Sequence, residues 1–178
     1  MTPSLLTSRL ILRPPQLGDA DALALYLNDF EVSGNLARVP YPYLRSDAVA
    51  WLGSQRPRPA AEETSFAIEL AGVGYVGHIG YQKVGEVPVI GYWLGKPFWG
   101  RGIMTEAAIA AIDWFFEASD ASDIYSGVFH FNQPSLAIQK RLGFTETGHS
   151  TLLCLARGVE LEHIDTKLAR SVWKARRQ

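Results

Sequence analysis

The stretch WLGKPFWGRGIMTEA, residues 93–107, joins a strand-like segment to a helix through a glycine-rich loop. A loop of this kind leaves backbone N–H groups pointing out of the helix N-terminus, where the helix dipole is positive. Such an end is suited to a phosphate or pyrophosphate group. A second stretch, NQPSLAIQKRLGF at residues 132–144, follows one strand later. Together the two stretches carry more information on function than the rest of the chain.

Strand and helix patterns alternate on both sides of this loop. Alternating hydrophobicity and turn residues predict strands at 7–14, 66–70, 75–81, 89–94, 124–129, 151–156 and 160–167. Helical spacing predicts helices at 19–28, 46–55, 105–117 and 134–142. Ser46 is expected to cap the second helix, and Gly143 to take the left-handed position that ends the fourth. The order predicts a mixed α+β sheet with helices on its faces, in a single domain over residues 1–178.

Size and composition narrow the class of protein. The chain has 178 residues and a net charge of −1, which gives no whole-domain field for nucleic acid or a membrane surface. Cys154 is the only cysteine, so an intrachain disulfide and a cysteine zinc site are excluded; we expect a buried strand cysteine and no metal. No apolar segment reaches 18 residues, and a soluble cytoplasmic protein is expected. Lys174, Arg176 and Arg177 are expected to form a solvated, partly frayed end.

Two other glycine patterns suggest nucleotide folds, and neither fits. Residues 72–77 spell GVGYVG, the dinucleotide fingerprint, but the following residues have the pattern of a strand, whereas the fingerprint must open a helix. A hairpin turn is the better interpretation. Residues 95–102 are a near miss to a P-loop, which needs Lys and then Ser or Thr after its second glycine. Arg101 and Gly102 stand there instead, which argues against a nucleoside triphosphatase.

The run WGRGIM at residues 99–104 resembles the cofactor loop of the GNAT superfamily of acyl-CoA-dependent N-acyltransferases, whose pattern is Gln/Arg-x-x-Gly-x-Gly/Ala. It matches at the central Gly102, with Trp99 and Met104 in place of the usual residues. The longer run 91–107 is similar to the branch that includes the ribosomal-protein N-terminal acetyltransferases. Further segments that resemble this branch, in the same order, are residues 7–13, Asn132 with Ser135, Leu142-Gly-Phe144, and Arg157-Gly158 followed by Glu162-His163.

The resemblance implies a fold in which two neighbouring parallel strands, 89–94 and 124–129, splay apart and hold acetyl-CoA in the notch between them. Backbone groups near Trp93 and Leu94 would pair with the pantetheine arm, as an added strand would. The loop amides would hold the pyrophosphate. Ser135 could also protonate the departing thiolate, which makes it a candidate catalytic residue. The residues expected to bind the cofactor are Trp93, Leu94, Gly100, Arg101, Gly102, Ile103, Met104, Thr105, Asn132 and Ser135.

The resemblance does not identify the general base. An ammonium acceptor must lose a proton before it attacks, yet Val89 stands where many relatives have Glu, and residues 151–155 contain none. Glu106, in the first turn of its helix, is expected to serve the helix dipole. Ordering both reactants can supply roughly 7–11 kcal/mol, so a missing base does not exclude an enzyme. The candidates are Glu162, which we select as the catalytic residue, and His78, His130 and His163.

The resemblance therefore implies an acetyl-CoA-dependent N-acetyltransferase that acts on a primary amine by direct attack on the thioester. The acceptor is a peptide N-terminus or a small-molecule amine, and the protein a monomer or homodimer. We expect the acceptor over the loop at 35–43 and the closing hairpin, where Tyr41, Tyr43 and Trp51 either line the site or pack in the core. The alternative is a CoA-binding sensor or partner module without turnover, which the absence of both usual glutamates favours.

Overall fold

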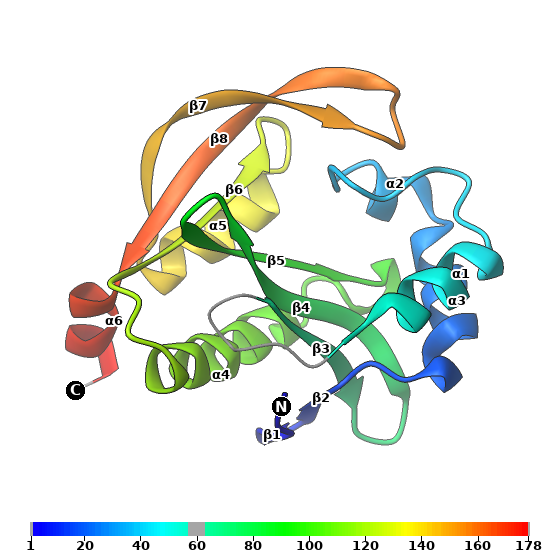
Figure 1. Ribbon diagram of the computed structural model, residues 1–178, viewed down its shortest axis with the longest axis horizontal. Helices are drawn as coiled ribbons and strands as arrows, with labels where there is room; N and C mark the ends of the chain where they lie inside the picture. The colour runs from blue at the N-terminus through cyan, green and yellow to red at the C-terminus, as the bar shows by residue number, and fades with distance from the viewer. Residues whose placement is uncertain (1, 57–62, 178) are drawn as a thin grey trace.

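A computed structural model describes residues 2–56 and 63–177, in which the strands form one mixed sheet (Figure 1). The strands follow the order β1-β2-β3-β4-β5-β6-β8-β7, and the pairing is antiparallel except between β5 and β6. Their bounds are β1 Leu5–Leu6, β2 Leu10–Arg13, β3 Glu63–Leu70, β4 Gly74–Val84, β5 Val87–Leu94, β6 Asp123–Phe129, β7 Thr145–Cys154 and β8 Val159–Ala169. The α+β sheet with a splayed parallel pair, predicted from the sequence, is confirmed.

Helices cover both faces of this sheet. They are α1 Ala20–Leu27, α2 Phe30–Ser33, α3 Arg45–Ser54, α4 Ile103–Ala118, α5 Gln133–Leu142 and α6 Arg170–Arg177, with short 3-10 turns η1 Leu17–Asp19 and η2 Lys96–Phe98. No helix in the described part of the chain is long and apolar enough to cross a membrane.

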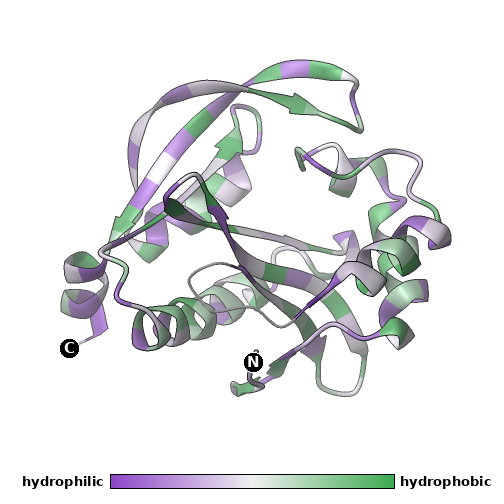
Figure 2. Ribbon diagram, viewed as in Figure 1, coloured by the Kyte–Doolittle hydropathy of each residue, from purple (hydrophilic) through white to green (hydrophobic). Residues whose placement is uncertain are grey.

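The main core lies between α4 and the sheet. Hydrophobic residues gather along α4 and the strands it covers (Figure 2). Phe115 of α4 stacks on Tyr81 of β4 with ring centroids 4.2 Å apart, and Trp114 meets Phe66 of β3 edge to face at 5.1 Å. A second cluster, which includes Leu23 of α1, packs α1 and α3 on the opposite face. The sheet is thus packed on both faces around the loop that joins β5 to α4.

The β7–β8 hairpin arches from the sheet to the segment that follows α2 (Figure 1). At its end, the Leu155 amide donates to the Ala37 carbonyl at 3.0 Å, and Arg157 Nε donates to the Gly34 carbonyl at 2.8 Å. The Arg157 guanidinium also lies over the rings of Phe30 and Phe131, at 4.9 and 4.6 Å from their centroids. One arginine therefore joins the hairpin, α2 and the turn after β6, and closes the arch.

Several local predictions are confirmed. Gly72 and Gly74 have φ of 75° and 100° and form the turn between β3 and β4, so the GxGxxG match is a hairpin. Gly143 ends α5 with φ of 99°. Cys154 is buried at the end of β7.

Other local predictions are wrong. Ser46 is not the cap of α3: the helix begins at Arg45, and the Asp47 carboxylate accepts from the Leu44 amide at 2.8 Å. The basic end is not frayed, because it forms α6, where Trp173 is 4% exposed. β7 begins six residues before the predicted 151, at Thr145, since its exposed residues give no hydrophobic alternation.

Candidate active site

The two parallel strands separate almost as soon as they pair. Val89 of β5 pairs with Tyr125 of β6, and no further pairing of these strands follows in the described residues. A continued ladder would bring a β6 amide to the Ile90 carbonyl. Instead, the hydroxyl of Ser126 donates to that carbonyl at 3.0 Å. A side chain thus ends the ladder and opens a fork between the strands.

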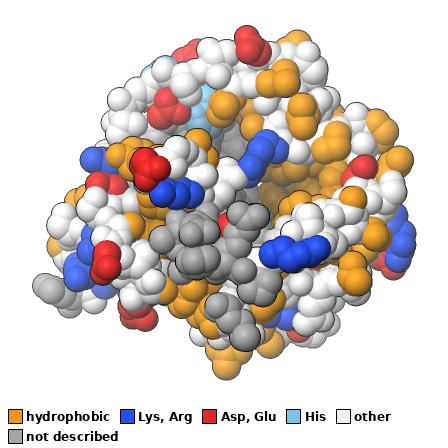
Figure 3. Space-filling view, in the orientation of Figure 1, with side chains coloured by type: hydrophobic (Ala, Val, Ile, Leu, Met, Phe, Trp, Pro, Cys, Tyr) orange, Lys and Arg blue, Asp and Glu red, His pale blue; other side chains and the backbone are white. Residues whose placement is uncertain are grey.

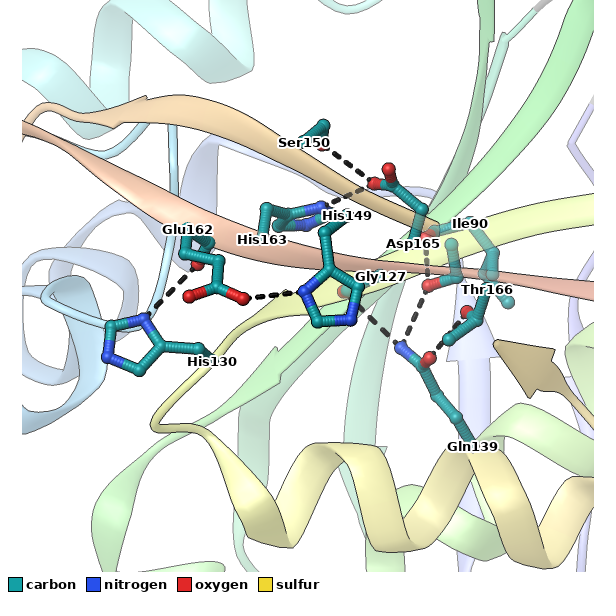
Figure 4. A network of polar contacts seen from close by, with 11 residues as sticks. Ile90, Gly127, His130, Gln139, His149, Ser150, Glu162, His163, Asp165 and Thr166 are labelled. Carbon is teal, nitrogen blue, oxygen red and sulfur yellow. Dashed lines mark hydrogen bonds and ion pairs between the residues drawn. The ribbon is translucent and has the colours of Figure 1, made fainter. Parts of the chain in front are cut away.

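A buried polar chain fixes the base of this fork (Figure 4). The side-chain amide of Gln139, on α5, donates to Ser126 Oγ at 3.0 Å and to the Gly127 carbonyl at 3.3 Å. Thr166 of β8 in turn donates to Gln139 Oε1 at 2.6 Å. Gln139 is only 1% exposed, and burial without partners would be costly, so the completed network specifies where β5, β6, α5 and β8 meet.

Alternation along β5 decides which backbone groups face the fork. The Gly95 amide donates to the Val76 carbonyl of β4 at 2.9 Å, so Trp93, two residues earlier, also directs its main chain to β4. Tyr92 and Leu94 direct theirs to the β6 side. The Leu94 carbonyl is occupied there by the indole N–H of Trp99 at 2.9 Å, which leaves the Leu94 amide and the main chain of Tyr92 facing the fork.

The glycine-rich loop forms an open cradle at the end of β5. Gly100 and Gly102 have φ of 70° and 72°, and no protein atom lies within 4 Å of a Cβ placed on Gly100. None of the described residues accepts a hydrogen bond from the loop amides between Gly100 and Thr105. Converging unpaired amides at a helix N-terminus are the donor set that a pyrophosphate requires. The loop therefore fits the phosphate end of CoA.

A carboxylate behind this cradle ties it to the N-terminal segment. Glu106 accepts from Thr7 Oγ1 at 2.6 Å, from Ser8 Oγ at 3.0 Å, and from the amide and Nε of Arg9 at 3.0 and 2.7 Å. Arg9 also donates to the Arg101 carbonyl at 3.1 Å. Partial burial disfavours the charged form, but these hydrogen bonds win and lower the pKa of Glu106 to about 2. Its role thus exceeds the helix-dipole effect that we expected.

Across the fork, α5 presents Asn132 and Ser135. Asn132 caps the helix, since its side-chain oxygen accepts from the Ser135 amide at 3.3 Å, which leaves the Asn132 NH₂ available. The Ser135 hydroxyl donates to the phenol oxygen of Tyr92 at 3.1 Å, and the phenol donates to the Ser135 carbonyl at 3.4 Å. Burial raises the pKa of Tyr92, so the phenol stays protonated at neutral pH. The two hydroxyls are thus hydrogen-bonded to each other beside the fork.

The opposite face of the sheet carries a histidine–carboxylate pair. His163 Nδ1 lies 2.8 Å from Asp165 Oδ1, and Ser150 Oγ donates to the same oxygen at 2.9 Å (Figure 4). The imidazole lies against Gly127 of β6, where an added Cβ would come within 2.1 Å of the ring.

Glu162 and the other histidines occupy different positions. The Glu162 carboxylate is half exposed and lies 2.5 Å from His149 Nδ1, while its carbonyl lies 3.3 Å from His130 Nδ1. His78 is buried on β4, where desolvation, with a smaller effect of Arg38, lowers its pKa to about 4. Its Nδ1 has no partner among the described residues. His78 therefore stays neutral near pH 7.

Under the arch of the β7–β8 hairpin, where the sequence predicted the acceptor, Figure 3 shows a hollow lined by hydrophobic side chains. Of the aromatic residues considered for it, Tyr43 is buried in the cluster of α1 and α3, and burial with the charge of Asp47 raises its pKa to about 12. Trp51 packs against that cluster and meets His78 edge to face. Tyr41 alone of the three is exposed, beside Phe30.

Sequence reasoning missed several residues that shape the site: Tyr92, Ser126, Gln139, His149 and Asp165. Tertiary contacts bring them together, and although Tyr92 and Gln139 lie within the stretches 91–107 and 132–144, nothing in the local pattern singles them out. An available signal was a serine at position 126, between apolar strand residues, because buried polar groups are almost always bonded.

A comparison with family models identifies this combination of fork and cradle. Residues 9–145 match the model described as an acetyltransferase (GNAT) domain. The chain belongs to the GNAT acetyltransferase family. This GNAT enzyme is therefore an N-acetyltransferase, as its sequence implied.

Individual relatives agree with this assignment. The uncharacterized N-acetyltransferase p20 of Bacillus licheniformis is 28% identical over 150 residues, which cover 82% of this chain and 84% of that protein. Among solved structures, the fold is similar to Mycobacterium smegmatis RimJ in complex with CoA-disulfide, with a TM-score of 0.79, 23% identity, and 91% and 82% of the two chains covered. It is also similar to the ribosomal-protein-S5-alanine acetyltransferase of Vibrio fischeri, with a TM-score of 0.81, 20% identity, and 96% and 98% covered.

Proposed function

We propose that this GNAT enzyme transfers the acetyl group of acetyl-CoA, bound across the β5–β6 fork, to the primary amine of a peptide N-terminus. The observation that carries the proposal is the set of unpaired amides at residues 100–105. They lie in the loop that joins β5 to α4, beyond the point where β5 diverges from β6. The thioester supplies an already activated acyl group. Binding it beside the acceptor would provide much of the rate acceleration through proximity.

Each part of the fork has a proposed role in binding. The amides of Gly100, Arg101, Gly102, Ile103, Met104 and Thr105 hold the pyrophosphate, by the helix-terminus effect. The amide of Leu94 pairs with the pantetheine arm. We assign the second pairing position to the main chain of Tyr92 instead of Trp93, because the Trp93 main chain is directed to β4. The Asn132 NH₂ contacts the same arm.

Ser135 is proposed to give a proton to the departing thiolate. Its hydroxyl lies at the start of α5 beside the fork and donates to the phenol oxygen of Tyr92, and solvent can restore the proton that it gives up. Ser135→Ala would remove this donor without touching the cradle. We expect slower turnover at unchanged acetyl-CoA affinity, and an unchanged turnover number would remove Ser135 as an acid.

The peptide acceptor is supported by the relatives, since one structurally similar protein is named as a ribosomal-protein acetyltransferase. The test is release of free thiol from acetyl-CoA with a panel of acceptors: peptides with N-terminal Ala or Ser, free amino acids, polyamines and aminoglycosides. We expect the peptides to give the highest kcat/KM. Faster reaction of a small amine would overturn the peptide assignment. Acetyl-CoA binding without turnover on any amine would favour the non-enzymatic CoA-binding module.

A further inference from the structure

On the acceptor face of the fork, two neighbouring positions are glycines and carry no side chain. Gly91 of β5 and Gly127 of β6 each lie two residues beyond the paired Val89 and Tyr125, so they share one face where the strands part. No heavy atom lies within 4 Å of a Cβ placed on Gly91. At Gly127 the vacated space is filled by the ring of His163. A histidine is thus held next to an open approach to the fork.

We propose that His163 is the general base that takes a proton from the acceptor ammonium, with Asp165 as its positioning residue. This proposal rests on the acetyl transfer proposed above. The Asp165 carboxylate, 2.8 Å from Nδ1, accepts a hydrogen bond from the N–H of that nitrogen and so fixes the tautomer. Nε2 is then left with its lone pair, and it has no hydrogen-bond partner among the described residues.

Packing limits the ring to this position. An alanine at Gly127 would place its Cβ 2.1 Å from Cε1, so only glycine admits the imidazole. The edge of the ring contacts Phe129, with centroids 5.8 Å apart and planes at 85°. Ser150 holds Asp165 from β7. The side chain of His163 is 15% exposed, so the ring is confined without being fully buried.

Glu162, the base selected from the sequence, is less well placed. Adjacent residues of a strand point to opposite faces, so Glu162 and His163 cannot both face the same side of β8. Glu162 shares its face with the buried Ile164, on the α5 side, and its carboxylate is engaged by His149 at 2.5 Å. The Glu162 side chain is also 55% exposed, so bulk water can accept a proton at that position and the carboxylate is not needed as a base there.

The proton balance is complete with groups already named. Nε2 of His163 takes one proton from the ammonium, and the imidazolium is stabilised by Asp165 and later releases that proton to solvent. The amine nitrogen forms a bond to the acyl carbon, and the carbon–sulfur bond breaks. The second proton leaves the nitrogen for solvent, and the thiolate takes a proton from the Ser135 hydroxyl, which solvent then restores. The amide retains the third.

Several charged and polar groups surround His163. On its face of β8 the charged neighbours are Asp165 and Lys167; β6 contributes Gly127, Phe129 and the phenol of Tyr125, and β7 contributes Ser150. Asp165 is the only group among these that bonds to the imidazole. Asp165→Asn should therefore lower kcat at unchanged acetyl-CoA affinity, because it removes the acceptor that fixes the tautomer of His163.

The decisive variant is His163→Gln, compared with Glu160→Gln, which changes an exposed residue of the same strand that has no role in the proposed mechanism. We expect His163→Gln to lower kcat roughly 10²-fold or more near pH 7 while calorimetry shows unchanged acetyl-CoA affinity. An N-terminal amine has a pKa near 8, so above about pH 9 the acceptor needs no base and the deficit should shrink. His163→Ala should regain turnover with added imidazole.

Three results would overturn the assignment: a kcat of His163→Gln within twofold of Glu160→Gln, a deficit that persists unchanged at high pH, or a larger loss in Glu162→Gln than in His163→Gln. The second and third would identify a structural role and a different base, respectively. If wild-type enzyme itself releases no thiol with any amine, the proposed acetyl transfer fails, and that outcome is distinct from failure of His163 alone.

Discussion

The hydroxyl of Ser126 and the main-chain carbonyl of Ile90 are joined across 3.0 Å at the point where β5 and β6 part. The hydroxyl is at the same time the acceptor for the buried amide of Gln139. One oxygen therefore replaces the main-chain ladder and anchors the helix that carries Asn132 and Ser135. The opening of the fork is thus a property of specific side-chain chemistry at a single strand position.

Ser126→Ala should weaken this clamp. The Ile90 carbonyl and the Gln139 amide would each lose a partner in a buried place, so the free energy of unfolding should fall by roughly 1–3 kcal/mol. Acetyl-CoA should bind less tightly, because the two sides of the fork are no longer held at one separation. Urea denaturation and calorimetric titration measure the two effects. The matched control is Ser122→Ala, which removes only an exposed hydroxyl bonded to Asp123; equal behaviour of the two variants would refute the clamp.

Gly100→Ala tests the cradle. The residue has φ of 70° with open space around its Cβ position, so alanine should cost roughly 1–2 kcal/mol of backbone strain and place a methyl group where the pyrophosphate must approach. Gly85, with φ of 59° in the β4–β5 turn, offers the same strain far from the fork. Both variants should lose similar stability by urea denaturation. Only Gly100→Ala should raise the Kd for acetyl-CoA, by tenfold or more; matching affinities would contradict the cradle.

The cradle and the fold could be predicted because their signals are local. Gly100 and Gly102 adopt left-handed geometry within one short loop, and Asn132 caps the helix that bears Ser135 three residues later. The pairing of His163 with Gly127 depends instead on the register of β8 against β6, which nothing in either segment alone specifies. Local sequence patterns could therefore predict the loop and the helix cap at the edge of the site, but not the contact between His163 and Gly127 inside it.

The C-terminal helix α6 was not predicted from the sequence, for a related reason. Over α6 the sequence RSVWKARR offers one large apolar side chain, so there is no hydrophobic periodicity to detect. Its order comes from tertiary contacts: Trp173 is buried in the main core and its indole N–H donates to Asp113 at 2.8 Å. Basic residues on the remaining surface made the segment resemble a solvated tail.

Trp173→Ala should consequently be among the most damaging changes outside the site. Removing a buried indole costs about 3–5 kcal/mol, and the Asp113 carboxylate also loses a donor. Thermal and urea unfolding should both show the loss. Val172→Ala, at the neighbouring and 41% exposed position, should change stability little. A Trp173 variant as stable as the Val172 variant would mean that α6 does not contribute to the core in solution.

Glu106 should make stability depend on pH in the acid range. Its native pKa of about 2 lies below the ordinary 4.5, so its stabilising contribution is complete above about pH 4.5 and is lost progressively as pH falls towards 2. Glu106→Gln should lower the free energy of unfolding at pH 7 by roughly 2–3 kcal/mol, because it removes charge-assisted bonds to Thr7, Ser8 and Arg9. The gap from wild type should narrow as urea denaturation is repeated from pH 7 down to pH 3.

The matched control is Glu86→Gln, which removes a fully exposed carboxylate paired with Lys83 on the β4–β5 turn. It should leave stability nearly unchanged at every pH. Glu106→Gln should additionally weaken acetyl-CoA binding, because Arg9 holds the Arg101 carbonyl of the cradle only while Glu106 orients its guanidinium. A constant stability gap between pH 7 and pH 3 would show that the carboxylate stabilises the fold by packing, and the ionic link between the N-terminal segment and the cradle would then be wrong.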